Sequence, residues 1–285
     1  MLTIAYLGPE HTNTHLAALK RFGRRSRYIH APTVDNVFTL VERDKAEYGV
    51  VPVENSLEGA VTHTLDRFID FKGSPVCITG EIEFPIQHYF ITRPGVKPST
   101  VQVVYSHPQA LAQCQKWIDE HLSKQRWLIE TNSTAEAVED VVHHDLRSAA
   151  WHSKRVAAIG SREAARKHGL AVLPIAEDRE NKTRFLIIGK HIPAKAARNK
   201  TSILLALKDK PGALHDALVP FKRHHINLTK IESRPSKRKA WEYLFCIECE
   251  GHASEPRLKR ALKALERSTS LLRVLGSYPI ASRYL

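Results

Sequence analysis

Short apolar runs alternate with helix-patterned segments through the first two thirds of the chain, and this alternation limits the possible folds more than any other feature. Thr3–Leu7 and Tyr48–Val53 are apolar runs of strand length, whereas Thr12–Phe22 and Val34–Arg43 carry apolar residues at helical spacing. A repeated strand–helix order favours parallel sheets with helices on both faces. With a closing strand over residues 184–188, the sequence predicts an α/β fold for this part.

The pattern changes after residues 189–200, GKHIPAKAARNK, whose glycine, proline and charges are typical of a linker. The remainder follows the order strand, helix, strand, strand, helix, strand, which predicts a ferredoxin-like βαββαβ module. We therefore expect two domains, over residues 1–190 and 200–285. The expected elements of the second are strands over 201–207, 226–232, 241–250 and 271–278, and helices over 211–224 and 256–265.

Hydrophobic residues make up 42% of the chain, but none of their runs approaches the roughly 20 residues that a membrane-spanning helix needs. The first residues, MLTIAYLGPE, lack a basic segment ahead of an apolar stretch, which argues against a signal peptide. We therefore expect a cytoplasmic protein without a membrane partner.

The net charge of +13 is concentrated near the C-terminus, where residues 196–285 carry 18 Lys and Arg against 8 Asp and Glu. A basic nucleic-acid-binding regulator is therefore one alternative for this chain. Its run Lys237-Arg238-Lys239, however, lies between two expected strands, where a solvated hairpin loop is the simpler explanation. Because nothing nearby resembles a recognition helix or a stacking surface, we expect no nucleic-acid partner.

Four cysteines, Cys77, Cys114, Cys246 and Cys249, are too few and too scattered for a disulfide framework. Cys246 and Cys249 have the C-x-x-C spacing, but the segment WEYLFCIECEG favours a strand, in which side chains three apart point to opposite faces. A metal or redox role for this pair is the less favoured alternative. Without an H-E-x-x-H, Walker or G-x-G-x-x-G motif, the sequence predicts no metal and no cofactor.

Polar clusters occupy comparable strand–helix junctions in the first domain, where open α/β sheets bind their ligands. Helix N-termini at such junctions also present free N–H groups to anions. Each cluster alone could be a capping turn, with Ser56 as a helix cap and Glu58 as a first-turn acid, but several together favour a binding site. The clusters are Gly8–His15, Glu54–Gly59, Ser106–Gln109 and Asn181–Phe185.

These segments resemble the prephenate dehydratase domain in order and spacing. The resemblance rests on Gly8-Pro9-Glu10 with Thr12 and Thr14-His15, on Val51–Gly59 (VPVENSLEG), on Ser106–Leu111 (SHPQAL) and on Thr183-Arg184-Phe185. The C-terminal part resembles an ACT domain of the kind fused to that enzyme, through Pro211-Gly212-Ala213-Leu214 and Glu232-Ser233-Arg234-Pro235. Together these segments extend the resemblance over nearly the whole chain.

The resemblance implies a two-lobed catalytic domain, similar to a periplasmic binding protein, with the active site in the cleft between lobes. One lobe would hold approximately residues 1–78 with the end of the domain, and the other residues 79–175. The implied reaction is the decarboxylating dehydration of prephenate to phenylpyruvate in phenylalanine biosynthesis. Thr183 would give a proton to the departing hydroxyl, and Arg184 would hold a carboxylate. The implied sets are catalytic Thr183, Arg184, Phe185, Asn55, Ser56 and Glu54, and substrate-binding Thr12, Thr14, Ser106 and Gln109.

For the ACT domain, the resemblance implies allosteric control by L-phenylalanine bound between the subunits of a homodimer or homotetramer. Binding there would bias the cleft toward a state of low activity. The implied effector contacts are Gly212, Ala213, Leu214, Asn227, Leu228, Glu232, Ser233 and Arg234.

The first loop departs from the family pattern, because His11 replaces a glycine and Asn13 replaces an aromatic residue. Glycine at such a position commonly permits a positive φ or a close backbone approach. His11 could narrow the cleft or add a cation near a carboxylate, so arogenate is an alternative substrate. A ligand-binding sensor without catalysis is a second alternative, although the Thr183-Arg184-Phe185 segment favours an enzyme.

Overall fold

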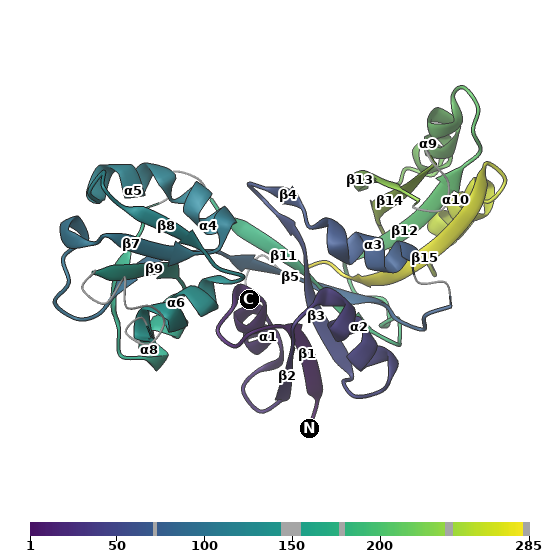
Figure 1. Cartoon of the computed structure of the whole chain (residues 1–285). Coiled ribbons are helices and arrows are strands. Elements are labelled where there is room, and N and C mark those ends of the chain that lie inside the picture. Colours follow the sequence, from purple (N-terminus) through teal and green to yellow (C-terminus); the bar gives the residue numbers. More distant parts are fainter. Residues whose placement is uncertain (71–72, 144–154, 177–179, 237–241, 282–285) are drawn as a thin grey trace.

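The computed structural model describes residues 1–70, 73–143, 155–176, 180–236 and 242–281, which form three β-sheets with their helices (Figure 1). In this view the first sheet lies between the second sheet and the C-terminal module. The run Lys237-Arg238-Lys239 and the expected strand start at Trp241 lie outside the described residues. Of the helices in the described ranges, none is both long enough and apolar enough to cross a membrane.

The first sheet combines strands from the beginning and the end of the first domain in the order β2-β1-β3-β11-β5, with β4 paired to β3. The strands β1, β2 and β3 pair in parallel, and β11 runs antiparallel between β3 and β5. Its strands are β1 (Thr3–Leu7), β2 (Arg27–Ala31), β3 (Tyr48–Asn55), β4 (Gly59–Ala60), β5 (Cys77–Pro85) and β11 (Lys182–Gly189), and its helices are α1 (Asn13–Phe22), α2 (Val34–Glu42) and α3 (Thr62–Asp70).

The second sheet has the order β10-β6-β9-β7-β8, in which β7 is parallel to both β8 and β9 while β6 is antiparallel to β9 and β10. Phe90, Val104, Ile118 and Ile159 are buried in one of its cores. Its elements are β6 (Tyr89–Thr92), η1 (Pro98–Thr100), β7 (Val103–Ser106), α4 (Pro108–Gln113), α5 (Gln115–His121), β8 (Trp127–Glu130), α6 (Thr134–Val142), β9 (Val156–Gly160), α8 (Arg162–Lys167) and β10 (Ala171–Pro174).

The C-terminal module is an antiparallel sheet of order β13-β14-β12-β15 with two helices, which confirms the expected βαββαβ order. Cys246 and Cys249 lie on β14 as free cysteines and belong to different hydrophobic clusters, as expected for opposite faces of a strand. The elements are β12 (Asn199–Leu207), α9 (Ala213–Arg223), β13 (Leu228–Pro235), β14 (Tyr243–Glu250), α10 (Pro256–Leu265) and β15 (Thr269–Pro279).

The C-terminal module packs directly on the first sheet. Ile78 and Leu186 of the first sheet share one buried cluster with Leu204 and Tyr278 of the module. A Cβ built on Gly276 would lie 2.1 Å from the carbonyl oxygen of Ile78, so only glycine permits β15 to approach β5 this closely. The two domains therefore share a hydrophobic core next to β11.

Two local expectations differ from the structure. The strand β5 pairs with β11 in the first sheet, so the second sheet begins at Tyr89 and not near residue 79. The helix expected soon after Asn55 begins only at Thr62, because residues 56–58 form a turn and Gly59 has a φ of 83°. Ser56 is therefore not the cap of that helix.

Candidate active site

A cavity of about 580 Å³ lies between the first and second sheets and takes its walls from both. Its walls combine the loop after β1, the end of β3, the start of α4 and the start of β11. Of the residues expected from the sequence, the walls include Thr12, Thr14, Asn55, Gln109, Thr183 and Phe185. The expected residues that are not among its described wall residues are Glu54, Ser56, Ser106 and Arg184.

Asn55 and Thr183 face each other across paired strands at the cavity wall. The Oδ1 atom of Asn55 accepts the backbone N–H groups of Leu57, at 2.9 Å, and Glu58, at 3.1 Å. This fixes the amide orientation, so Nδ2 must donate to Oγ1 of Thr183 at 3.0 Å. Because Oγ1 is the acceptor in that bond, the Thr183 proton is left for an acceptor in the cavity.

Four helices begin at the cavity wall: α4, whose start carries His107 and Gln109, and also α1, α3 and α6. The wall includes Thr12 and Thr14 at α1, Thr62 at α3, and Ser133 with Thr134 at α6. Neither Lys nor Arg is among the described wall residues. An anionic ligand in this cavity would therefore meet helix dipoles and neutral donors instead of fixed cations.

Some of these hydroxyls also hold the loops in place. Oγ1 of Thr12 caps α1 by accepting the N–H of His15 at 3.3 Å, and it donates to the carbonyl oxygen of Pro9 at 2.9 Å. Oγ of Ser133 accepts the N–H of Glu136 at 3.0 Å at the start of α6. The cap residues thus fix the positions of the N-termini that face the cavity.

The loop that departs from the family pattern joins the two lobes. His11 has a φ of 65°, in the left-handed region that favours glycine, and its carbonyl oxygen accepts Oγ of Ser161 at 3.0 Å. Burial and the neighbouring Lys167 keep the pKa of His11 below its ordinary value of 6.5. His11 is not among the described wall residues, whereas Asn13 is. His11 therefore does not add a cation to the wall of the cavity.

A hydrogen-bonded group links the lobes beside Asn55. Oε1 of Gln113 accepts Nδ2 of Asn181 at 3.0 Å and lies 2.9 Å from Nε2 of His88. Oδ1 of Asn181 in turn accepts Nδ2 of Asn55 at 2.9 Å. Sequence reasoning missed His88 and Gln113, although Gln113 follows Gln109 by one helical turn and therefore shares its face of α4.

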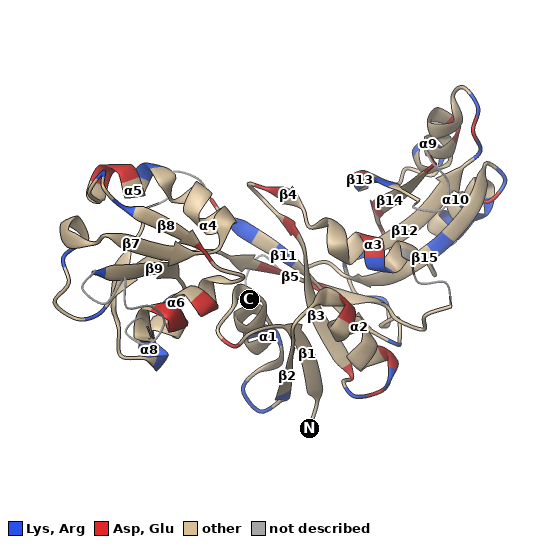
Figure 2. Cartoon of the chain, in the orientation of Figure 1, with Lys and Arg blue, Asp and Glu red and all other residues tan. Residues whose placement is uncertain are grey.

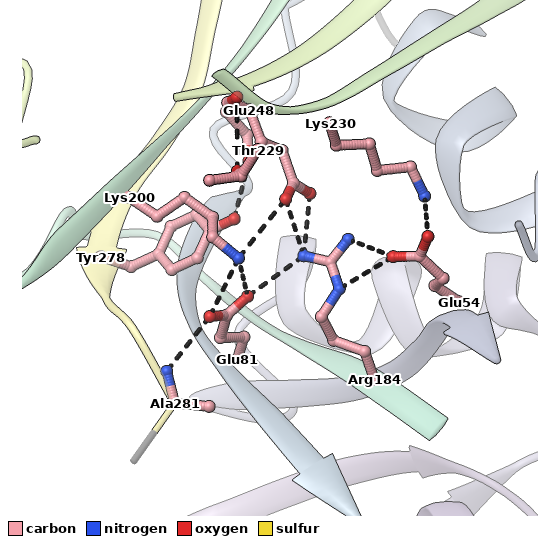
Figure 3. A network of polar contacts seen from close by, with 10 residues as sticks. Glu54, Glu81, Arg184, Lys200, Thr229, Lys230, Glu248, Tyr278 and Ala281 are labelled. Atoms are coloured by element: carbon pink, nitrogen blue, oxygen red, sulfur yellow. Dashed lines mark hydrogen bonds and ion pairs between the residues drawn. The ribbon is translucent and has the colours of Figure 1, made fainter. Parts of the chain in front are cut away.

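Arg184 lies on the other face of β11, in a buried ion-pair network at the joint with the C-terminal module (Figure 3). Its side chain is only 10% exposed. Nη1 contacts both carboxylate oxygens of Glu248 at 2.9 Å and Oε2 of Glu81 at 3.1 Å, while Nη2 contacts Glu54 at 2.8 Å. The structure does not bring the guanidinium of Arg184 to the cavity, because neighbours on a strand point to opposite faces.

The charges of this network favour the ionised forms of two of its carboxylates, Glu54 and Glu81. Burial alone would raise the pKa of Glu54, but the charges of Arg184 and Lys230 outweigh it and lower the pKa. The pKa of Glu81 is lowered in the same way, by Lys200 and Arg184 acting against burial. In Figure 2, acidic positions on β5 lie beside basic positions on β11.

Ser56 and Ser106 hold the backbone near the cavity. Oγ of Ser56 accepts the N–H of Lys182 at 3.0 Å and donates to the carbonyl oxygen of Glu180 at 3.2 Å. Oγ of Ser106 is buried and donates to the carbonyl oxygen of Ile159 at 2.7 Å. These bonds tie the turn after β3 to the start of β11, and β7 to β9.

The residues expected to bind the effector occupy two places in the C-terminal module. Gly212, with a φ of 77°, caps α9, which begins with Ala213 and the partly exposed Leu214. Asn227 lies just before β13 and accepts the N–H of Glu250 at 2.9 Å through its carbonyl oxygen. Leu228, Glu232, Ser233 and Arg234 lie on β13 itself.

Arg234 reaches out of the module to the first domain. Its Nε lies 3.0 Å from Oδ1 of Asp66 and its Nη2 lies 3.3 Å from Oδ2, which places both contacts on α3. In this structure the guanidinium expected at the effector site therefore contacts the domain that contains the cavity.

Comparison with known proteins places this geometry in a family. The family model described as Prephenate dehydratase matches residues 4–193, and the ACT domain model matches residues 201–267. The chain is 45% identical over 282 residues to a bifunctional chorismate mutase/prephenate dehydratase of Aquifex aeolicus, covering 98% of this chain and 74% of that protein. It is 40% identical over 253 residues to a prephenate dehydratase of Methanocaldococcus jannaschii, covering 86% of each.

A solved structure agrees with both sequence matches. The prephenate dehydratase of Arthrobacter aurescens, in complex with L-Phe, superposes with a TM-score of 0.87 at 33% identity, covering 98% of this chain and 90% of that one. The chain therefore belongs to the prephenate dehydratase family, with an ACT domain after its catalytic domain.

Proposed function

We propose that the chain converts prephenate to phenylpyruvate in L-phenylalanine biosynthesis, and that the Asn55–Thr183 pair is the centre of the reaction. The observation that carries this proposal is the oriented bond from Nδ2 of Asn55 to Oγ1 of Thr183 at the cavity wall. The amide N–H of Asn55 is the polarising neighbour that a weakly acidic threonine hydroxyl needs in order to act as a proton donor.

The reaction needs little from the protein beyond orientation and one proton. The ring carboxylate leaves as CO2, and its bonding electrons enter the ring as the C–O bond to the ring hydroxyl breaks. Thr183 donates its proton to that departing oxygen, which leaves as water, and the N–H of Asn55 stabilises the charge that develops on Oγ1. Water then returns a proton to Thr183, so that prephenate plus one proton gives phenylpyruvate, CO2 and water.

The two carboxylates of prephenate are held by neutral donors. The candidates are the N-terminal residues of α1, α3 and α6, together with Gln109 at the start of α4. His107 also lies on the wall, and its Nδ1 accepts the N–H of Gln109 at 3.3 Å, which leaves Nε2 as the protonated nitrogen of the neutral ring. Burial keeps the pKa of His107 below its ordinary value, which favours this neutral form.

The expected site residues that lie outside the cavity wall have supporting roles in this proposal. Ser56 and Ser106 fix the backbone beside the cavity through the bonds described above. Glu54 and Arg184 hold β3 and β11 from the opposite face, behind Asn55 and Thr183. Phe185 contributes an apolar wall for the ring of the substrate.

The C-terminal module provides control by L-phenylalanine. We assign the effector site to the segment from Gly212 to Leu214, Asn227, and the strand carrying Leu228, Glu232, Ser233 and Arg234. The complex of the Arthrobacter aurescens relative with L-Phe supports L-phenylalanine as the ligand. The proposal includes domains over 1–190 and 200–285, a homodimer or homotetramer with the effector between subunits, and a cytoplasmic location, since the relatives are biosynthetic enzymes.

The deciding experiment incubates the purified protein with prephenate and follows phenylpyruvate by its ultraviolet absorbance, with and without phenylalanine. We expect turnover that phenylalanine lowers. A parallel incubation with arogenate measures the preference between the two substrates. Binding of prephenate without any product would contradict the proposal and would favour a ligand-binding sensor.

A further inference from the structure

The strands β3 and β11 carry two cross-strand pairs that face opposite sides of the first sheet. Thr183 pairs with Asn55, and the next pair along the ladder is Arg184 with Glu54. The first pair lies at the cavity wall, whereas the second lies in the network at the joint with the ACT domain (Figure 3). A displacement of the second pair therefore moves the backbone that carries the first.

The ACT domain holds the second pair through two of its strands. Nζ of Lys230, on β13, lies 3.1 Å from Oε1 of Glu54, and its side chain is 11% exposed. Glu248, on β14, contacts Arg184 at 2.9 Å. Lys230, Arg184 and Glu248 are nearly buried and need charged partners, whereas the side chain of Glu54 is 36% exposed. These contacts restrict the relative position of β13 and β3.

The same strand makes a second contact, with α3. Arg234 lies four residues after Lys230 on the same face of β13, and its guanidinium contacts both oxygens of Asp66. The helix that carries Asp66 begins with Thr62 and His63, which line the cavity. One strand of the ACT domain is therefore bound to two elements that build the cavity.

The strand β13 is also an edge strand, and it carries half of the residues assigned to the effector site. It lies at one end of the sheet order β13-β14-β12-β15, and its residues alternate between a more buried and a more exposed face. Of the residues assigned to the effector, Ser233 lies on one face of β13, whereas Glu232 and Arg234 share the other face with Lys230. A ligand bound to these residues would therefore contact the strand that makes both ion pairs. A displacement of β13 would therefore also displace β3 and α3, which it contacts through Lys230 and Arg234.

We propose that Lys230 and Asp66 are positioning residues that couple the effector strand to the cavity. The ion pairs Lys230–Glu54 and Arg234–Asp66 set the placement of Asn55 and of the start of α3, and the effector changes that placement by moving β13. This inference rests on the proposed function. It predicts that either pair can be broken with loss of control but not of effector binding.

The test uses the full-length variants Lys230→Met and Asp66→Asn. Glu54 keeps Arg184 as a partner when Lys230 is replaced, so Lys230→Met leaves no carboxylate without a cation. Lys230→Arg retains a cation that can reach Glu54 and should restore the wild-type response. The matched control is Lys190→Met, which breaks an ion pair with Asp44 of 2.7 Å inside the first domain.

Two quantities are measured for each variant: the ratio of prephenate turnover without and with saturating phenylalanine, and the Kd of phenylalanine by calorimetry. We expect the ratio to fall by about fivefold or more in Lys230→Met and Asp66→Asn, the lower end of typical coupling, with Kd nearly unchanged. The ratio should stay at the wild-type value in Lys190→Met and Lys230→Arg.

An unchanged ratio in both Lys230→Met and Asp66→Asn would overturn the inference, even if both variants were less stable, because a purely structural role affects stability alone. Loss of phenylalanine binding in these variants would also overturn it, by placing the residues in the effector site. Wild-type protein that does not turn over prephenate would overturn the proposed function and the inference together.

Discussion

Nδ2 of Asn55 lies 3.0 Å from Oγ1 of Thr183 and can act only as the donor in that bond, because the backbone N–H groups of Leu57 and Glu58 fix Oδ1 of the same amide. The two residues are partners in the β3–β11 ladder, so main-chain pairing sets their separation. The pair thus has the preorganised geometry that favours charge development on a hydroxyl oxygen.

Asn55→Asp should remove this donor with little change in shape. The new carboxylate can still accept the N–H groups of Leu57 and Glu58, but it cannot donate to Thr183. We expect kcat for prephenate to fall by about 10²-fold or more, the usual effect of losing one oriented donor. Steady-state kinetics would measure this, with circular dichroism as the check on folding. A kcat close to that of the wild type would show that the Asn55 donor is dispensable.

Arg184→Met should act on stability more than on substrate binding. Glu81 and Glu248 would lose a buried cation, which typically destabilises a protein by about 3–5 kcal/mol. Urea unfolding measures this, with Arg257→Met as a control, since that exposed pair with Glu255 should contribute less than about 1 kcal/mol. A large rise in KM without loss of stability would instead indicate that Arg184 binds a substrate carboxylate.

Acidification should destabilise the first domain through His15. Burial, and then the nearby His11, lower the pKa of His15 from 6.5 to about 4. In the unfolded chain His15 binds a proton below pH 6.5, whereas in the folded chain it does so only below about pH 4. The free energy of unfolding therefore falls as the pH drops through this window. The lowered pKa of His15 corresponds to a loss of about 3 kcal/mol in the free energy of unfolding once the pH has fallen through this window.

The check is the free energy of unfolding at pH 7 and pH 4.5 for the wild type and for His15→Gln. The glutamine oxygen can replace Nδ1 as the acceptor for the N–H of His11, a bond of 2.9 Å in the structure. The variant should lose less stability between the two pH values than the wild type does. Equal losses would show that His15 does not contribute to the pH dependence.

His11→Gly should stabilise the protein by about 1 kcal/mol, since a residue with a side chain is strained in the left-handed region that its φ of 65° occupies. Thermal unfolding measures the effect. His11→Ala is the matched control, because it removes the imidazole and keeps the Cβ. Should alanine stabilise as much as glycine does, the imidazole and not the backbone would be the source of strain.

The sequence was sufficient to predict four of the segments that meet at the cavity, but not the starts of α3 and α6 or the position of His88. Asn55 ends a strand of the first sheet, Gln109 follows a strand of the second, and Thr183 is the second residue of the strand that closes the first domain. The position of β5 could not be predicted, because its apolar pattern is the same whichever sheet it joins. The choice depends on pairing with β11, which is distant in the sequence.

The orientation of Arg184 had a signal in the sequence, since its neighbour on a strand must point the other way. The ion-pair partners of Arg184 had no such signal in the sequence. Glu81 and Glu248 are 103 and 64 residues away, and no local pattern shows that a carboxylate from another domain will cover that face. His11 was a different case, because its replacement of a family glycine indicated either a positive φ or a close backbone approach, and the structure has the positive φ.

The most direct test of the central claim is the turnover of prephenate by Thr183→Ala and Thr183→Ser beside the wild type. The account predicts that alanine lowers kcat by about 10²-fold or more while the fold and phenylalanine binding persist, and that serine, which keeps the hydroxyl, retains most of the activity. Near-normal turnover by a folded Thr183→Ala protein would contradict the assignment of Thr183 as the proton donor.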